Sequence, residues 1–148
     1  MAQGTATKST SMISTTSVVH GVVGGLTGGV VFGLMMQAFG MIPMVAMLVG
    51  SEAVAVGWIV HLVNSAIFGA AFGLIAGARQ MGLGMQLAMG AAYGLVLWVV
   101  GALLLMPARL GMDLFVINEM SVRSLMGHLV FGVILGGVVA ILARRHAR

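Results

Sequence analysis

The chain has 148 residues, of which 60% are hydrophobic and 7% are charged, and its mean hydropathy is +1.14. Because a soluble domain carries about 25% charged residues, this composition leaves too little polar surface for a water-soluble chain and predicts an integral membrane protein. The net charge of +4 comes from seven Lys and Arg near the ends of apolar segments, so we attribute it to membrane topology and expect no nucleic-acid partner. The absence of cysteine excludes disulfides, thiolate catalysis and cysteine-ligated metals.

Four segments have the roughly 20 apolar residues that cross a bilayer as a helix. They are residues 18–39, 53–78, 85–106 and 124–143. Residues 41–50 are apolar but too short to span, so we expect them in the interface, and residues 107–119 should lie along the membrane surface. The sequence therefore predicts an all-α membrane domain over 17–143, with a retained polar tail at 1–16 and a basic tail at 144–148.

Charged residues predict the orientation of these spans. Four spans place both termini on one side, which then holds five of the seven basic residues, while the other side holds two basic residues and all three acids. Positive charge favours the cytoplasmic side, so we expect both termini to be cytoplasmic in the inner membrane. The five residues are Lys8, Arg79, Arg144, Arg145 and Arg148.

The chain contains a weak internal repeat. The sequence GVVFGLM at 29–35 aligns with GAAYGLV at 90–96, and His61-Leu-Val aligns with His128-Leu-Val. Each repeat, about 18–78 and about 85–143, is then a helical hairpin. Because two spans per repeat preserve its orientation, an axis along the membrane normal should relate the halves and place the two histidines at equal depth.

Small residues recur at every fourth position of each span. Residues four apart lie on one face of a helix, and such faces allow helix backbones to approach closely in a bilayer. We therefore predict a bundle packed through glycine faces. These packing residues are Gly21, Gly25, Gly29, Gly33, Ser65, Gly69, Gly73, Gly77, Gly90, Gly94, Gly132 and Gly136.

Two histidines lie inside the predicted spans, where ionisable residues tend to face the bundle interior. One interpretation is that neutral His61 and His128 bond to neighbouring polar groups and bridge helices. The sharper hypothesis is a haem b held by His61 and His128, because two imidazoles at equal depth suit bis-histidine ligation.

Methionine suggests another cofactor. Nine of the 14 methionines fall towards the predicted outer side, and Met41, Met44 and Met47 repeat at helical spacing. Thioethers are soft ligands suited to Cu(I), although methionine also fills gaps in apolar cores. We therefore keep a Cu(I)-binding protein as a further alternative, together with a proton or small-solute path lined by the intramembrane polar residues.

The stretch GAAYGLVLWVVGALLLMPARLGM, followed by EMSVRSLMGHLVFGVILG, resembles small bacterial inner-membrane proteins of the YagU-like family. HLVNSAIFG in the second span is also similar, and the resemblance covers about the last two-thirds of the chain. It implies a helical membrane fold and a connection with acid tolerance, without a defined biochemical activity.

No motif for nucleophilic or acid–base catalysis is present in the sequence. We therefore expect a non-enzymatic accessory or self-associating packing subunit, embedded in the lipid bilayer as a homo-oligomer or as part of a larger membrane complex. Binding no cofactor is the simplest expectation, and haem b is the main alternative.

Overall fold

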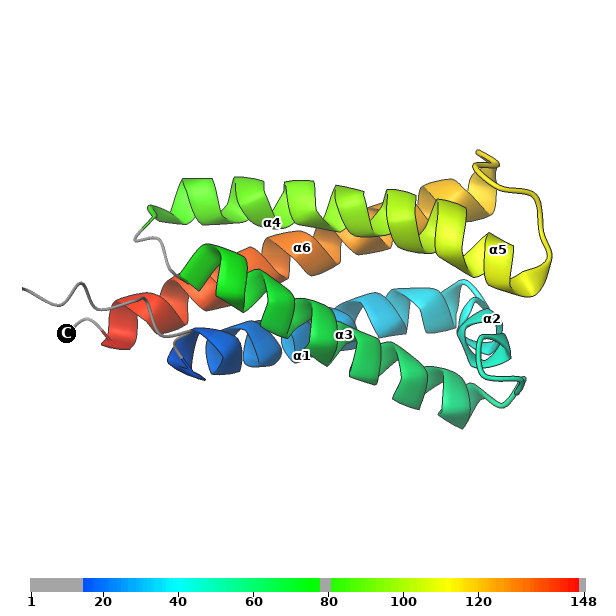
Figure 1. Cartoon of the computed structure of the whole chain (residues 1–148), viewed down its shortest axis with the longest axis horizontal. Helices are drawn as coiled ribbons and strands as arrows, with labels where there is room; N and C mark the ends of the chain where they lie inside the picture. The colour runs from blue at the N-terminus through cyan, green and yellow to red at the C-terminus, as the bar shows by residue number, and fades with distance from the viewer. Residues whose placement is uncertain (1–14, 78–80, 147–148) are drawn as a thin grey trace, which may run out of the picture.

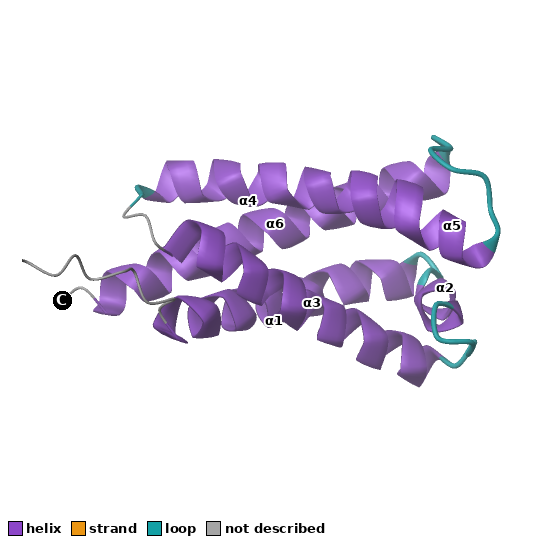
Figure 2. Ribbon diagram, in the orientation of Figure 1, coloured by secondary structure: helices purple, strands orange, loops and turns teal. Residues whose placement is uncertain are grey.

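The computed structural model describes residues 15–77 and 81–146, and this part of the chain is built from helices and connecting loops (Figure 2). Lys8, Arg79 and Arg148, which enter the orientation argument, lie outside the described residues. The elements are α1 (Thr15–Ala38), α2 (Ile42–Met47), α3 (Val54–Gly77), α4 (Leu83–Leu97), the π-helical η1 (Trp98–Leu105), α5 (Met106–Leu110) and α6 (Glu119–His146).

Four helical stretches within these residues are long and apolar enough to cross a membrane. This confirms the predicted all-α, multi-pass architecture. The third stretch is longer than expected, since it continues past Pro107 to Leu110. The spans are Thr15–Ala38, Val54–Ala76, Leu83–Leu110 and Glu119–Arg145.

The helices are not equally covered by one another. Helix α1 packs extensively against both α3 and α6, α4 packs mainly against α6, and α3 and α4 contact each other little. In Figure 1 the start of α1 and the end of α6 lie at one end of the bundle, and α2 and α5 lie at the other. We call the second of these the α2–α5 end.

The two main helix pairs approach until their backbones touch. A Cβ atom added to Gly21 would overlap the carbonyl oxygen of Gly69, and one added to Gly73 would overlap that of Ser17, so α1 and α3 have no space between them for larger side chains. In the α4–α6 pair, an added Cβ on Gly90 would overlap the carbonyl oxygen of Gly132, and the reverse also holds.

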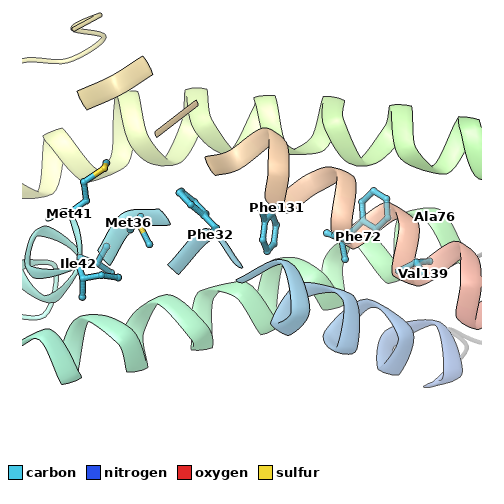
Figure 3. Packing of buried hydrophobic residues seen from close by; sticks show 10 residues of the cluster. Phe32, Met36, Met41, Ile42, Phe72, Ala76, Phe131 and Val139 are labelled. Carbon is cyan, nitrogen blue, oxygen red and sulfur yellow. The ribbon is translucent and has the colours of Figure 1, made fainter. Parts of the chain in front are cut away.

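A second face of α1 meets α6 in the same manner. A Cβ added to Gly28 would lie 2.8 Å from the carbonyl oxygen of Phe131, and one on Gly24 would lie 2.9 Å from a methyl carbon of Leu135. Larger side chains fill the remaining space in a row along the bundle axis (Figure 3). The row includes Phe32, Met36, Ile42, Phe72, Phe131 and Val139, and Leu135 belongs to the same buried cluster.

The short α2 is part of the bundle as well as a cover for its end. Ile42 and Ala46 are fully buried, and a Cβ added to Gly57 would overlap the carbonyl oxygen of Ile42. Helix α2 therefore lies directly on the start of α3. Contacts with protein therefore explain part of the apolar character of residues 41–50. The sequence alone predicted that these residues lie in the membrane interface.

Candidate functional site

Within the described residues, two histidines and a group of methionines around one cleft carry side chains that could bind a ligand. The His61 Nε2 lies 2.8 Å from the carbonyl oxygen of Gly29 and donates to it, so this imidazole links α3 to α1. The hydroxyl of Ser65 donates to the carbonyl oxygen of His61 at 2.8 Å, one turn earlier in the same helix.

His128 is bonded differently. Its Nδ1 donates to the carbonyl oxygen of Ser124, 2.8 Å away in the same helix, and lies 3.3 Å from the Ser124 hydroxyl. The two histidines therefore have different roles in the structure. His61 bridges two helices, whereas the hydrogen bonds of His128 stay within α6.

The ring of Phe32 contacts both imidazoles. Its centroid is 5.4 Å from that of His61 and 4.8 Å from that of His128, both in edge-to-face arrangements. Both histidines therefore contact the same aromatic ring of α1. A haem held by both imidazoles would compete for space with this buried phenylalanine ring, and the Nε2 of His61 is already bonded to Gly29.

The residues as they stand therefore do not fit a bis-histidine haem, because both a ring and a hydrogen bond would have to be displaced. A Cβ on Gly127 would also overlap the Phe32 ring, which leaves that ring no space on the α6 side. Haem binding by His61 and His128 stays a prediction.

Other glycines of the spans also lie against neighbouring helices. In addition to the pairs above, Gly25 and Gly29 face Ser65, and Gly33 faces the ring of Trp58. In the second pair, a Cβ on Gly94 would overlap the carbonyl oxygen of His128, and one on Gly136 would overlap that of Gln86. Gly77 ends α3.

Methionines gather around a cleft at the α2–α5 end. The cleft has a volume of about 80 Å³. Its thioether-bearing residues come from four parts of the chain, namely the start of α2, the start of α5, the loop that follows α5, and the start of α6. They are Met41, Met44, Met106, Met112 and Met120.

Only two of the three methionines predicted from spacing line this cleft. Met47 is 44% exposed and is absent from the lining. Three residues of an α-helix advance about 300°, so a residue six positions away points about 120° from the first. A three-residue spacing therefore cannot keep Met41 and Met47 on one face.

The loop beside the cleft is held by defined hydrogen bonds. Asn118 Oδ1 accepts from the Ser121 backbone N–H at 2.9 Å, and Ser121 Oγ accepts from the Asn118 N–H at 2.8 Å. This reciprocal arrangement caps α6 and explains why the helix begins at Glu119, earlier than predicted. Trp98 Nε1 then donates to the carbonyl oxygen of Ser121 at 2.9 Å. The Asn118-x-x-Ser121 spacing was a sequence signal for this start.

Comparison with known proteins assigns this chain to no family. No family model, curated protein or solved structure matches this chain. The resemblance to YagU-like proteins therefore stays a prediction.

Proposed function

We propose that this protein is a non-enzymatic membrane subunit in which two tandem helical hairpins form a rigid bundle that associates with further copies through α4. The polar groups inside the bundle support a scaffolding role, because several of them join helices. His61 bonds to Gly29, and the Tyr93 hydroxyl donates to the carbonyl oxygen of Phe68 at 2.9 Å, which links α4 to α3.

Equivalent contacts in the two hairpins support the tandem repeat. In the first hairpin, Gly29 lies against Ser65, and in the second, the aligned Gly90 lies against the aligned Gly132. One turn away, Gly25 lies against Gly69. The aligned pair in the second hairpin is Gln86 and Gly136, which are also in contact. Packing through small residues at matching positions is what an internal duplication of a glycine-faced hairpin would produce.

The observation that carries the proposal is an uncovered small-residue face on α4. Gly84, Ala88 and Ala92 follow one another at four-residue spacing and are all exposed, and a Cβ on Gly84 would meet no neighbouring atom within 4 Å. In α1, both glycine faces are covered, one by α3 and the other by α6. Only 17% of the third span is buried, compared with 44% of the first. A second face of this kind on α4 favours docking of another helix.

Self-association in liposomes tests the proposal. Since the chain has no cysteine, a single cysteine introduced in place of Leu114 can carry a fluorophore. The oligomer fraction is then counted by single-molecule photobleaching at increasing lipid dilution. We expect the protein to associate, and we expect Ala92→Leu to weaken association about tenfold, or about 1.4 kcal/mol, because the leucine side chain would separate the helices.

Ala55→Leu is the matched control, since Ala55 is exposed on α3 and lies outside the α4 face. This variant should associate like the unmodified protein. A protein that stays monomeric at every dilution would contradict the proposal. Equal losses in Ala92→Leu and Ala55→Leu would show that α4 is not the surface involved.

A further inference from the structure

Beyond this scaffolding role, we propose that the methionine-lined cleft at the α2–α5 end is a binding site for a soft monovalent cation, Cu(I). The proposal concerns binding alone and includes no change in the oxidation state of the metal. It rests on the residues that the fold brings together at one place, and it holds whether or not the protein associates through α4.

The methionines of the cleft come together only in the folded protein. The lining methionines are separated by up to 79 positions in sequence, from Met41 to Met120. Two hairpins and the loop after α5 must all be in place before these side chains surround one cleft. A stripe of methionines on a single helix would carry no such implication.

Two of the methionine side chains that line the cleft are exposed. Methionine is a common gap-filler in apolar cores, and this accounts for Met41, which is 7% exposed. It does not account for Met112 and Met120, which are 51% and 42% exposed and still line the cleft. Flexible thioethers at an open rim offer donors that can close around an ion, while the buried member provides a fixed floor.

The thioether sulfur atoms of the cleft are the kind of donor that Cu(I) prefers. Thioethers are neutral and soft, and they select Cu(I) over harder divalent ions. Asp113 also lines the cleft and would balance one positive charge, whereas the remaining polar lining is uncharged. Arg123, three residues after Met120 in α6, lies 4.9 Å over the ring of Phe39 and pairs with Glu119. Its charge is thus partly neutralised beside the site.

Backbone hydrogen bonds hold the loop that carries Met112 beside the cleft. The Phe115 N–H donates to the carbonyl oxygen of Leu103 at 2.9 Å, and the Met112 N–H donates to that of Pro107 at 2.9 Å. Gly111 adopts a left-handed conformation, with φ of 68°, that turns the chain from α5 into the loop. The Met112 backbone is therefore anchored to the third span, which keeps the exposed thioether beside the cleft.

Competition for Cu(I) tests this site. The full-length protein in nanodiscs is titrated against a chromophoric Cu(I) chelator under ascorbate, and X-ray absorption of the loaded protein identifies the atoms bound to copper. We expect about one Cu(I) per chain with sulfur neighbours. The double variant M112L/M120L should weaken binding at least about tenfold, because two thioether donors are removed.

Leucine has nearly the volume of methionine and both positions are exposed, so the double variant should fold normally, which its circular dichroism and elution profile will check. The matched control is M85L/M126L, since Met85 and Met126 are 58% and 52% exposed and lie outside the cleft lining. This control should bind Cu(I) like the unmodified protein.

Three outcomes would overturn the proposal. The first is a protein that takes no Cu(I) from the chelator. The second is an M112L/M120L variant that binds with unchanged affinity. The third is a copper site with nitrogen neighbours only, which would assign binding to imidazole. Zn(II) provides the selectivity control, and we expect the cleft not to compete for it.

Discussion

Single residues at the α1–α3 contact determine how closely the two helices lie. Gly69 faces both Gly21 and Gly25, and a Cβ on Gly69 would overlap the carbonyl oxygen of Gly21. The overlapping atom belongs to the backbone, so no side-chain rotation can relieve the contact. The helices themselves would have to separate, and contacts along their whole interface would weaken together.

We therefore predict that Gly69→Ala lowers the free energy of unfolding by about 1–3 kcal/mol, the usual cost of an added group in a filled interior. Titration of the protein from mild detergent into sodium dodecyl sulfate, followed by tryptophan fluorescence, measures this change. Gly84→Ala is the control, because its added Cβ would meet nothing within 4 Å and alanine is the better helix former. A Gly69→Ala variant as stable as Gly84→Ala would contradict the close contact.

At the residue level, sequence periodicity predicts faces of small side chains, since spacing by four places them on one face whatever lies opposite. It does not predict that Phe32 of α1 contacts both His61 and His128, because that contact depends on how a third helix is rotated. The same limit applies to the cleft, where Met112 belongs to a loop without periodicity.

Among the elements, the third span differs most from a regular helix. Residues Trp98–Leu105 form a π-helix, and Pro107 follows at the start of α5. The length of the apolar segment predicted an end near residue 106, and a proline lacks an N–H and its ring clashes with the preceding turn of an α-helix. The wider π turn leaves the regular bonding pattern before the proline, and the helix therefore continues to Leu110.

Each residue of a helix turns the side chains that follow it by about 100°, so the number of residues in this segment determines which later side chains face the bundle. We predict that deletion of Gly101 rotates everything after it by about 100°. Leu103, which is 6% exposed, would leave the bundle interior. The free energy of unfolding should fall by at least about 1 kcal/mol, measured by the same detergent titration.

Gly101→Ala is the matched control for this deletion, because it keeps the residue count and its Cβ would meet no atom within 4 Å. Its stability should equal or exceed that of the unmodified protein. A deletion variant that is equally stable would contradict this prediction, and would mean that the π segment absorbs the deletion by becoming regular α-helix.

On the scale of the whole molecule, composition and span length were sufficient to predict a four-span helical membrane protein, because the bilayer admits few alternatives. The order in which the helices cover one another was not predictable. A symmetric pair of hairpins would give α3 and α4 a contact like that of α1 and α6, and the structure gives them much less. The difference arises because α1 has a second glycine face, and α6 packs against that face.

The orientation of this bundle also decides which compartment supplies the methionine cleft. Basic residues at the C-terminal end, including Arg144 and Arg145, predict that this end is cytoplasmic, so the α2–α5 end should face outwards. Single cysteines test this, because the chain has none of its own. In intact bacterial cells, a membrane-impermeant maleimide should label Leu114→Cys, while Ala143→Cys should react only after permeabilisation. Both side chains are exposed, so a difference in labelling reports the compartment. Labelling of Ala143→Cys from outside would reverse the orientation, and the cleft would then draw its cation from the cytoplasm.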